Sequence, residues 1–224
     1  MASHLGVDAG SYDVAIRRFI PGYDAMIATV LSILDEHLGA DPLVVDLGAG
    51  TGALAGAILD AIPRARVVLV DIDPTMLAVA GARVACHGRR AELRTASFFD
   101  AGALPSCDAV VASLSLHHVP ERDRKRELYT RIHGALQPGG VLLSADATVH
   151  EAGPERARIF REWAAGMAAA GIGADEATAL FAQWAGEDRY YPLAVELELL
   201  AAAGFAHPDC FWKQGASTVF GGFR

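Results

Sequence analysis

Five short apolar runs alternate with helical stretches between residues 42 and 146, and this alternation constrains the fold more than any other feature. The runs read "PLVVDLG", "ARVVLVDID", "AELRTASF", "CDAVVASLSL" and "PGGVLLSAD". Nearly continuous Val and Leu indicate strands that are buried on both faces, as in a parallel sheet with helices on either side. The third run is more polar, and its apolar part is short, which is typical of an edge strand. The sequence therefore predicts a doubly wound α/β domain.

Helical segments and a closing hairpin flank this core. Residues 12–38 have a helical pattern that is interrupted at Pro21-Gly22, which indicates two helices joined by a bend. Helical stretches are expected around 155–170 and 175–186, followed by the helix "PLAVELELLAAAGF". The segments "HPDCFWKQ" and "STVFGGFR" are predicted as two strands joined at Gly215, which add an antiparallel edge. We expect one domain, with cap helices in 1–40, the ligand-binding sheet core in 41–150, a helical cap in 151–191 and the closing helix and hairpin in 192–224.

Composition limits what the domain can bind. Of the 224 residues, 52% are hydrophobic and 21% are charged, which is enough for a packed core. The net charge of −8 at pH 7 disfavours binding to a nucleic-acid backbone, because each neutralised phosphate needs a Lys or Arg. The mixed-sign run "ERDRKRE" is expected to be a solvated surface. No run of about 18 apolar residues predicts a membrane span, and "MASHLGVDAG" lacks the pattern of a signal peptide.

The cysteines indicate the compartment. Cys86, Cys107 and Cys210 are scattered, odd in number and without C-x-x-C spacing. Such usage predicts neither a disulfide framework nor a zinc site, so we expect three buried thiols and no metal. It is typical of the reducing cytoplasm, and a cytoplasmic protein is therefore expected.

A glycine-rich turn follows the first predicted strand. The strand ends at Gly48-Ala49-Gly50, and a helix is expected to begin near Thr51 or Gly52. Glycine is needed there either because a β-carbon would block a ligand or because the backbone requires a positive φ. In open α/β sheets, ligands bind beyond the carboxyl ends of the strands at the point where the strand order reverses. The turn therefore predicts a ligand site, with a purely structural corner as the alternative.

Two ligands fit the glycines. Gly48, Gly50 and Ala53 satisfy G-x-G-x-x-G/A, and Asp71 ends the second strand where a dinucleotide site places its ribose acid, so a nicotinamide-dependent oxidoreductase is one interpretation. Asp46 favours another, because a carboxylate two residues before the turn would crowd a pyrophosphate but suits a cation without phosphate. S-adenosylmethionine has an ammonium group, a sulfonium and no phosphate.

Five motifs in order give the chain a family resemblance over about residues 12–222. They are "VVDLGAGTG", "LVDIDPTML", "DAVVASLSLHHV", "LQPGGVLLSAD" and the ending "LLAAAGF" with its hairpin. Together they resemble the class I (Rossmann-like) S-adenosylmethionine-dependent methyltransferases. The resemblance implies a seven-stranded sheet of order 3-2-1-4-5-7-6 with strand 7 antiparallel. It also implies S-adenosylmethionine as cofactor and S-adenosylhomocysteine as product.

The resemblance assigns roles to several positions. Gly48 and Gly50 would lie against the methionine part and the ribose, and Asp46 would hold the ammonium end. Asp71 would accept hydrogen bonds from both ribose hydroxyls. Ile72 and Met76 would cover one face of the adenine, and Ser97, with Phe98 next to it, would contact the adenine amino group. Ser113, at the end of the fourth strand, completes the predicted cofactor-binding residues. Ser97 stands where many family members have an acidic residue, and Asp100 is the substitute.

The N-terminal stretch "YDVAIRRFIPGYD" is similar to a subgroup whose leading helices close over the cofactor, including the carboxy-S-adenosylmethionine synthases. By this resemblance, Tyr12 and Arg17 or Arg18 would face the carboxylate of the cofactor. An amphipathic helix with solvated arginines is the alternative. Alignment on Ala203-Gly204-Phe205 places Leu199 where that family has an arginine for its extra carboxylate, which does not favour a carboxylated cofactor.

Candidate catalytic residues follow the fourth and fifth strands. His117 and His118 have the pKa range of a general base, with packing or cofactor contact as the alternative. Asp146 and His150 lie at the same expected edge of the sheet. The acceptor pocket is expected under the N-terminal helices and the segment 151–191, whose larger side chains favour a planar or apolar small molecule: Trp163, Met167, Phe181, Trp184, Tyr190 and Tyr191.

The sequence thus predicts a methyltransferase with a small-molecule acceptor and with no nucleic-acid or membrane partner. A homodimer stays open. The alternatives are an RNA- or protein-modifying methyltransferase, a nicotinamide-dependent oxidoreductase and a protein that binds the cofactor without turnover.

Overall fold

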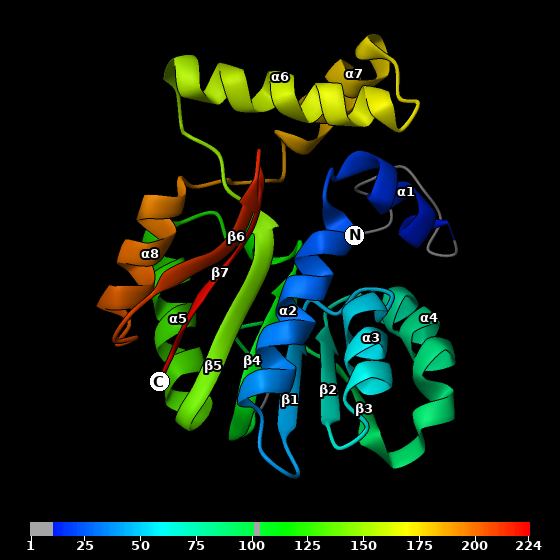
Figure 1. Cartoon of the computed structure of the whole chain (residues 1–224), viewed down its shortest axis with the longest axis vertical. Helices are drawn as coiled ribbons and strands as arrows, with labels where there is room; N and C mark the ends of the chain where they lie inside the picture. The colour runs from blue at the N-terminus through cyan, green and yellow to red at the C-terminus, as the bar shows by residue number, and fades with distance from the viewer. Residues whose placement is uncertain (1–10, 101–103) are drawn as a thin grey trace.

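A seven-stranded sheet organises the computed structural model, which describes residues 11–100 and 104–224 (Figure 1). The strand order is β3-β2-β1-β4-β5-β7-β6, and β7 runs antiparallel to both of its neighbours. The predicted fold class and strand order are confirmed. The strands are β1 Leu43–Leu47, β2 Arg66–Asp71, β3 Ala91–Thr95, β4 Cys107–Ser113, β5 Leu136–Ala147, β6 Asp209–Gln214 and β7 Ser217–Phe223. The stretch in which we expect no signal peptide, residues 1–10, lies outside the described part of the chain.

Helices cover both faces of the sheet because the central strands are apolar on both faces. Alternate residues of β1 pack into separate core clusters, Val44 on one face and Val45 on the other. The first cluster is completed by α2 Tyr23–His37, α3 Ala53–Ala61 and α4 Pro74–Val84, and the second by α5 Arg122–Ala135 and α8 Leu193–Ala202. Two short 3₁₀ segments, Ala85–Arg90 and Leu116–His118, join these elements.

Three further helices form a cap over the carboxyl ends of the parallel strands: α1 Tyr12–Phe19, α6 Gly153–Ala169 and α7 Ala174–Trp184 (Figure 1). The chain bends between α1 and α2, as predicted, where Gly22 has a φ of +79°. The indole N–H of Trp163 on α6 donates to the carbonyl oxygen of Phe19 at 2.7 Å. The two parts of the cap, far apart in sequence, are thus joined directly.

The charged run on α5 is not entirely a solvated surface. Lys125 is 1% exposed, and its ammonium group pairs with Glu196 on α8. The second oxygen of Glu196 accepts from the hydroxyl of Tyr129 at 2.7 Å. The expectation of a fully solvated run is therefore wrong at this position, because a buried carboxylate from α8 supplies the partner that a buried ammonium needs.

The cysteines differ in burial. Cys107 is buried, as expected, and Cys210 is half-buried. Cys86 is exposed on the 3₁₀ segment after α4. The expectation of three buried thiols is therefore wrong for Cys86. Within the described ranges, every helix is too short or too polar to cross a membrane.

Close contact between β5 and β7 leads to a stability prediction. A β-carbon at Gly221 would lie 1.8 Å from the carbonyl oxygen of Leu142, so neither strand can accept it without moving. We expect Gly221→Ala to lower the free energy of unfolding by about 2 kcal/mol or more. Urea denaturation measures the change. Gly134→Ala, on an exposed face of α5 with open space around it, serves as the control and should be neutral or stabilising. Equal stability of the two variants would contradict the prediction.

Candidate functional site

The turn after β1 has three glycines with left-handed backbone conformations. Gly48, Gly50 and Gly52 have φ values of +70°, +55° and +73°, which side chains with a β-carbon rarely adopt. A β-carbon at Gly48 would also lie 2.4 Å from that of Ser115, in the loop after β4. The hydroxyl of Ser115 donates to the carbonyl oxygen of Leu47 at 2.7 Å, which fixes the two loops together.

Asp46 is a buried acid for which the described residues supply no partner. Its side chain is 1% exposed, and neither carboxylate oxygen has a hydrogen-bond donor among them. Burial, together with the nearby charge of Asp71, raises the pKa of the Asp46 carboxyl from an ordinary 3.8 to about 7. Asp46 lines a small cavity between the glycine turn and α1, to which Tyr12, Tyr23 and Ser113 also contribute. The cavity is therefore suited to a ligand that brings a positive charge or a donor.

Asp71 at the end of β2 is held by backbone donors. One oxygen accepts from the N–H of Gly50 at 2.8 Å, and the other accepts from the N–H of Asp73 at 2.9 Å. These bonds lock the carboxylate to the glycine turn. Ile72, the next residue, is 70% exposed, whereas Met76 is buried, with its methyl carbon 3.5 Å from the place of a β-carbon on Gly50.

The turn after β3 is close to the glycine turn. The ring of Phe98 comes within 3.3 Å of the place of a β-carbon on Gly48. Ser97 is half-buried, and its N–H donates to Asp100 at 2.7 Å. Asp100 thus closes the turn in which Ser97 lies. The predicted residues Ser97, Phe98 and Asp100 therefore occupy one short segment beside the predicted cofactor pocket.

The cap helix α1 contacts the glycine turn through Asp13. Its carboxylate accepts from the hydroxyl of Thr51 at 2.6 Å and pairs with Arg83 on α4. Tyr12, the preceding residue, lines both the cavity beside Asp46 and a second cavity next to it. The first of these holds about 20 Å³ of free space, so a nucleoside can enter only if α1 or its side chains move.

The two arginines of α1 lie elsewhere. Arg17 donates to Asp24 at 3.0 Å, and Arg18 donates to the carbonyl oxygens of Ala170 and Gly171 at the end of α6. Neither is among the described residues that line the cavities on either side of Tyr12. The structure does not bring Arg17 or Arg18 to the predicted cofactor pocket.

His117 lies between two buried carboxylates at the base of the cap. Its Nδ1 is 2.5 Å from Asp146 at the end of β5, and its Nε2 is 3.6 Å from Asp188, which follows α7. Burial lowers the pKa of His117, but the Asp146 and Asp188 charges outweigh it, and the net pKa is raised. The pKa of Asp146 is lowered, because its attraction to His117 outweighs its own burial. His117 is therefore a weaker candidate for a base than an isolated histidine.

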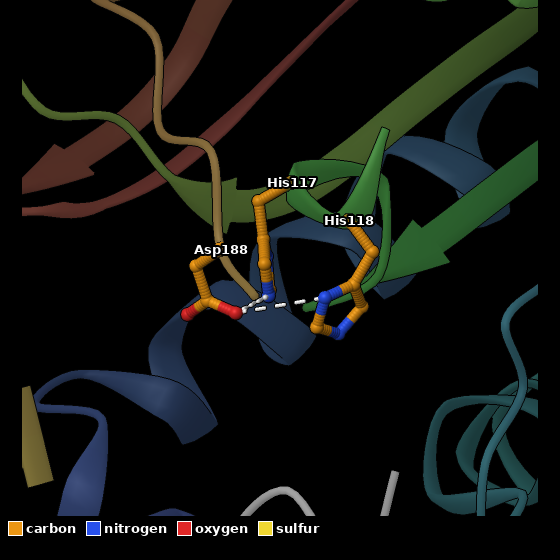
Figure 2. Close-up of side chains that lie close together, drawn as sticks. All are labelled: His117, His118 and Asp188. Atoms are coloured by element: carbon orange, nitrogen blue, oxygen red, sulfur yellow. Dashed lines mark ion pairs between the residues drawn. The ribbon is translucent and has the colours of Figure 1, made fainter. Parts of the chain in front are cut away.

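His118 completes a cluster with His117 and Asp188. Figure 2 shows both imidazole rings directed at the same oxygen of Asp188, and the Nδ1 of His118 is 3.5 Å from it. The other oxygen of Asp188 accepts from the hydroxyl of Tyr190. His150, the further candidate, is exposed after β5.

The inner cavity lies beside Tyr12 and above His117, with about 30 Å³ of free space. Its lining includes Trp163, Trp184 and Tyr190, as predicted from the sequence, whereas Met167 is fully buried in the core. A larger cleft of about 660 Å³ adjoins it, and the expected residues Phe181 and Tyr191 line that cleft. This volume is in the range of small-molecule sites.

Three site residues were missed by the sequence interpretation. Asp188 is 70 positions after His118, in a segment for which only aromatic residues and Met167 were considered, so no local spacing links it to the histidines. Asp13 was passed over because its partners come from the glycine turn and from α4. Leu114 has a φ of +50°, unusual for a side chain with a branched γ-carbon, and it lines both inner cavities. The only local signal for Leu114 was its place after a predicted strand.

Comparison with known proteins identifies the sheet core. Residues 44–140 match the family model described as a methyltransferase domain. The carboxy-S-adenosyl-L-methionine synthase of Chromohalobacter salexigens is 31% identical over 138 residues, which cover 60% of this chain and 50% of that protein. The synthase of the same name from Shewanella amazonensis is 31% identical over 62% of this chain and 58% of its own length. The chain thus spans little more than half the length of these curated relatives.

Solved structures share the fold over most of the chain. An O-methyltransferase family protein from Burkholderia thailandensis has a TM-score of 0.64 at 22% identity, covering 90% of this chain and 58% of that one. Human N-acetylserotonin methyltransferase, solved with SAM, has a TM-score of 0.60 at 21% identity, covering 88% and 51%. At such identity the likeness shows the fold.

The raised pKa of Asp46 predicts a pH-dependent stability. Between pH 3.8 and about 7 the unfolded chain ionises this carboxyl while the folded chain keeps it protonated, so stability falls as the pH rises through that window. Relative to Asp46→Asn, which cannot ionise, we expect the wild type to lose up to about 4 kcal/mol across the window. Urea denaturation of both proteins at several pH values measures this. A constant difference at every pH would contradict the assignment.

The contacts of Asp13 predict that it restrains α1. We expect Asp13→Ala to increase amide hydrogen exchange in α1, because it removes the bond to Thr51 and the ion pair with Arg83. Hydrogen-exchange mass spectrometry measures the protection of the helix. Asp24→Ala is the matched control, since it removes an exposed ion pair with Arg17 and should change little. Equal exchange in both variants would show that Asp13 does not hold the helix.

Proposed function

We propose that the chain, whose residues 44–140 match a methyltransferase domain, is a class I, Rossmann-like methyltransferase that methylates a small-molecule acceptor with S-adenosylmethionine as methyl donor. The single observation that carries the proposal is the buried carboxylate of Asp46, which has no donor among the described residues and borders the glycine turn. A pyrophosphate would place negative charge beside this carboxylate, whereas the ammonium group of S-adenosylmethionine supplies the missing positive charge.

The other contacts of the turn fit a nucleoside. Asp71 uses its backbone bonds to hold a fixed position, and a carboxylate has further lone pairs with which to accept from ribose hydroxyls. We assign one face of the adenine to the exposed side chain of Ile72 and its edge to the turn that contains Ser97 and Phe98. Ser113 lines the cavity at the end of β4, close enough to be assigned to the methionine part.

Bound S-adenosylmethionine supplies an electrophilic methyl group on a sulfonium. What the protein adds is position and exclusion of water, because a displacement needs donor and acceptor in line and in contact. Tyr12 borders both the proposed cofactor cavity and the inner cavity, and we therefore assign the reacting atoms a position beside it. We assign the contact with the acceptor's reacting group to His117 and His118, and the binding of its planar part to Trp163, Trp184 and the adjoining cleft.

A second candidate function comes from the relatives named carboxy-S-adenosyl-L-methionine synthases. An extra carboxylate needs a cationic partner, yet no Lys or Arg is among the described residues that line the two inner cavities. Leu199, at the aligned position of the family's arginine, is a partly buried residue of α8 that packs against the core. The acidic lining therefore favours the methyl donor over its carboxylated form. Mass spectrometry of ligand released from the purified protein separates the two, since the second is heavier by one carboxyl group.

The proposal predicts cofactor binding that depends on two acids. We expect calorimetry to show binding of S-adenosylmethionine and S-adenosylhomocysteine, and no binding of NAD or NADP. Asp71→Ala should weaken the binding by about 2 kcal/mol, because charge-assisted hydrogen bonds are lost. Asp175→Asn, an exposed acid at the start of α7, is the control. Binding of NAD alone, or unchanged affinity in Asp71→Ala, would overturn the assignment.

Asp46 adds a pH dependence to the same measurement. Affinity for the cofactor should rise as the pH rises through about 7, because only the ionised carboxylate attracts the ammonium group. Asp46→Asn removes this carboxylate, so the part of the rise that belongs to Asp46 should vanish. The same pH profile in both proteins would mean that Asp46 does not contact the charged end of the ligand.

A further inference from the structure

We propose that His117, His118 and Asp188 bind a divalent transition-metal ion at the inner cavity, beside the proposed cofactor pocket. The three residues come from two distant segments, the loop after β4 and the end of the helical cap, and meet around one point (Figure 2). This site is additional to the proposed methyl transfer, and metal binding can be measured without turnover.

The positions of the donor atoms fit a metal centre. One carboxylate oxygen of Asp188 lies 3.6 Å from Nε2 of His117 and 3.5 Å from Nδ1 of His118. Ligand atoms at the usual metal distances of about 2.0–2.2 Å are separated by roughly 3.4 Å in a tetrahedral site. The three ligand atoms form a triangle, and its two sides that meet at the Asp188 oxygen are already close to this length. All three atoms lie within 4.8 Å of one another. A small rotation of His118, whose side chain is 23% exposed, closes the third edge.

The surrounding residues hold the ligands in place. Asp146 contacts Nδ1 of His117 at 2.5 Å, which leaves Nε2 toward Asp188, the arrangement by which a carboxylate orients a metal-binding histidine. Tyr190 donates to the other oxygen of Asp188. The N–H of Arg189 donates to the carbonyl oxygen of His117 at 2.9 Å, so the two ligand-bearing segments are joined without any ion. The ligand triangle is therefore built by the fold.

The charge balance favours a cation. Asp146 and Asp188 have side chains that are 4% and 3% exposed, and both lie against His117. Two buried carboxylates around one imidazole leave negative charge even when the ring is protonated, and burying net charge is unfavourable. Lys125, a cation whose charge acts on Asp146 and His117, is itself paired with Glu196. A divalent ion would neutralise the negative charge that remains on Asp146 and Asp188.

Two imidazoles and one carboxylate leave coordination positions open, as in sites that bind Zn²⁺, Fe²⁺ or Co²⁺ and a further ligand. All three residues line the inner cavity with Trp184 and Tyr190, so an open position is accessible from it. The chemistry that fits there is an oxygen donor, a hydroxyl or carboxylate, on an aromatic molecule. The metal would thus anchor the acceptor beside Tyr12.

The experiment titrates metal-stripped protein with Co²⁺ and, separately, with Zn²⁺. Visible absorption reports the coordination of Co²⁺, and calorimetry gives the affinity and stoichiometry for Zn²⁺. We expect one equivalent to bind, with a Co²⁺ spectrum of four or five ligands. Asp188→Asn and His118→Ala should each weaken binding at least about tenfold. His207→Gln removes an exposed histidine elsewhere and serves as the matched control, with unchanged affinity.

Circular dichroism and thermal denaturation without metal establish that each variant is folded. Absence of Co²⁺ and Zn²⁺ binding to the wild type, or equal binding to the folded Asp188→Asn variant, would overturn the proposal. His117 would then be an imidazolium that bridges two aspartates. Calorimetry with S-adenosylmethionine distinguishes the two proposals: cofactor binding without metal binding refutes only the metal site, and the reverse refutes only the cofactor.

Discussion

Burial of acidic side chains at the carboxyl edge of one sheet is the constraint on which the rest of this structure depends. β1 contributes Asp46, β2 ends with Asp71 and β5 contributes Asp146, and all three are buried. Each acid has a different environment. Backbone N–H groups satisfy Asp71, an imidazole satisfies Asp146, and no described residue donates to Asp46. The first two acids have their partners within the protein, and the third is the one that we propose receives the cationic group of a ligand.

The cap is the part of the fold that buries this edge, because it keeps water away from the carboxylates. Helix α1 covers Asp46 and is held by Asp13 to Thr51, and α6 is held to α1 by the bond from Trp163 to Phe19. The cavities beneath are small as a result. Ligand entry therefore requires motion of the cap, and the polar bonds at the ends of α1 are the contacts that must yield.

Regular structure was predictable from the sequence to a greater degree than the site. Runs such as "LVVDL" identify buried strands by composition alone, and the bend at Gly22 and the hairpin turn at Gly215 follow from local backbone chemistry. The environment of Lys125 did not follow, because its partner Glu196 is on a helix 71 positions later. The same holds for Asp188 and for the partners of Arg17 and Arg18. Local patterns indicate which element a residue belongs to. Contacts between distant elements depend on how the helices pack against the sheet and against one another.

The loop after β4 connects the two halves of the site. Ser115 packs against Gly48 and bonds to Leu47, so one end of the loop is fixed to the glycine turn. At its other end, His117 bonds to Asp146 on β5 and accepts from Arg189 of the cap. A change in the cap therefore reaches the histidines through the backbone, whereas the glycine turn keeps its own bonds to Asp71. Under the proposed function, a change in the cap would therefore alter the site of the acceptor while leaving the cofactor site of the sheet core intact.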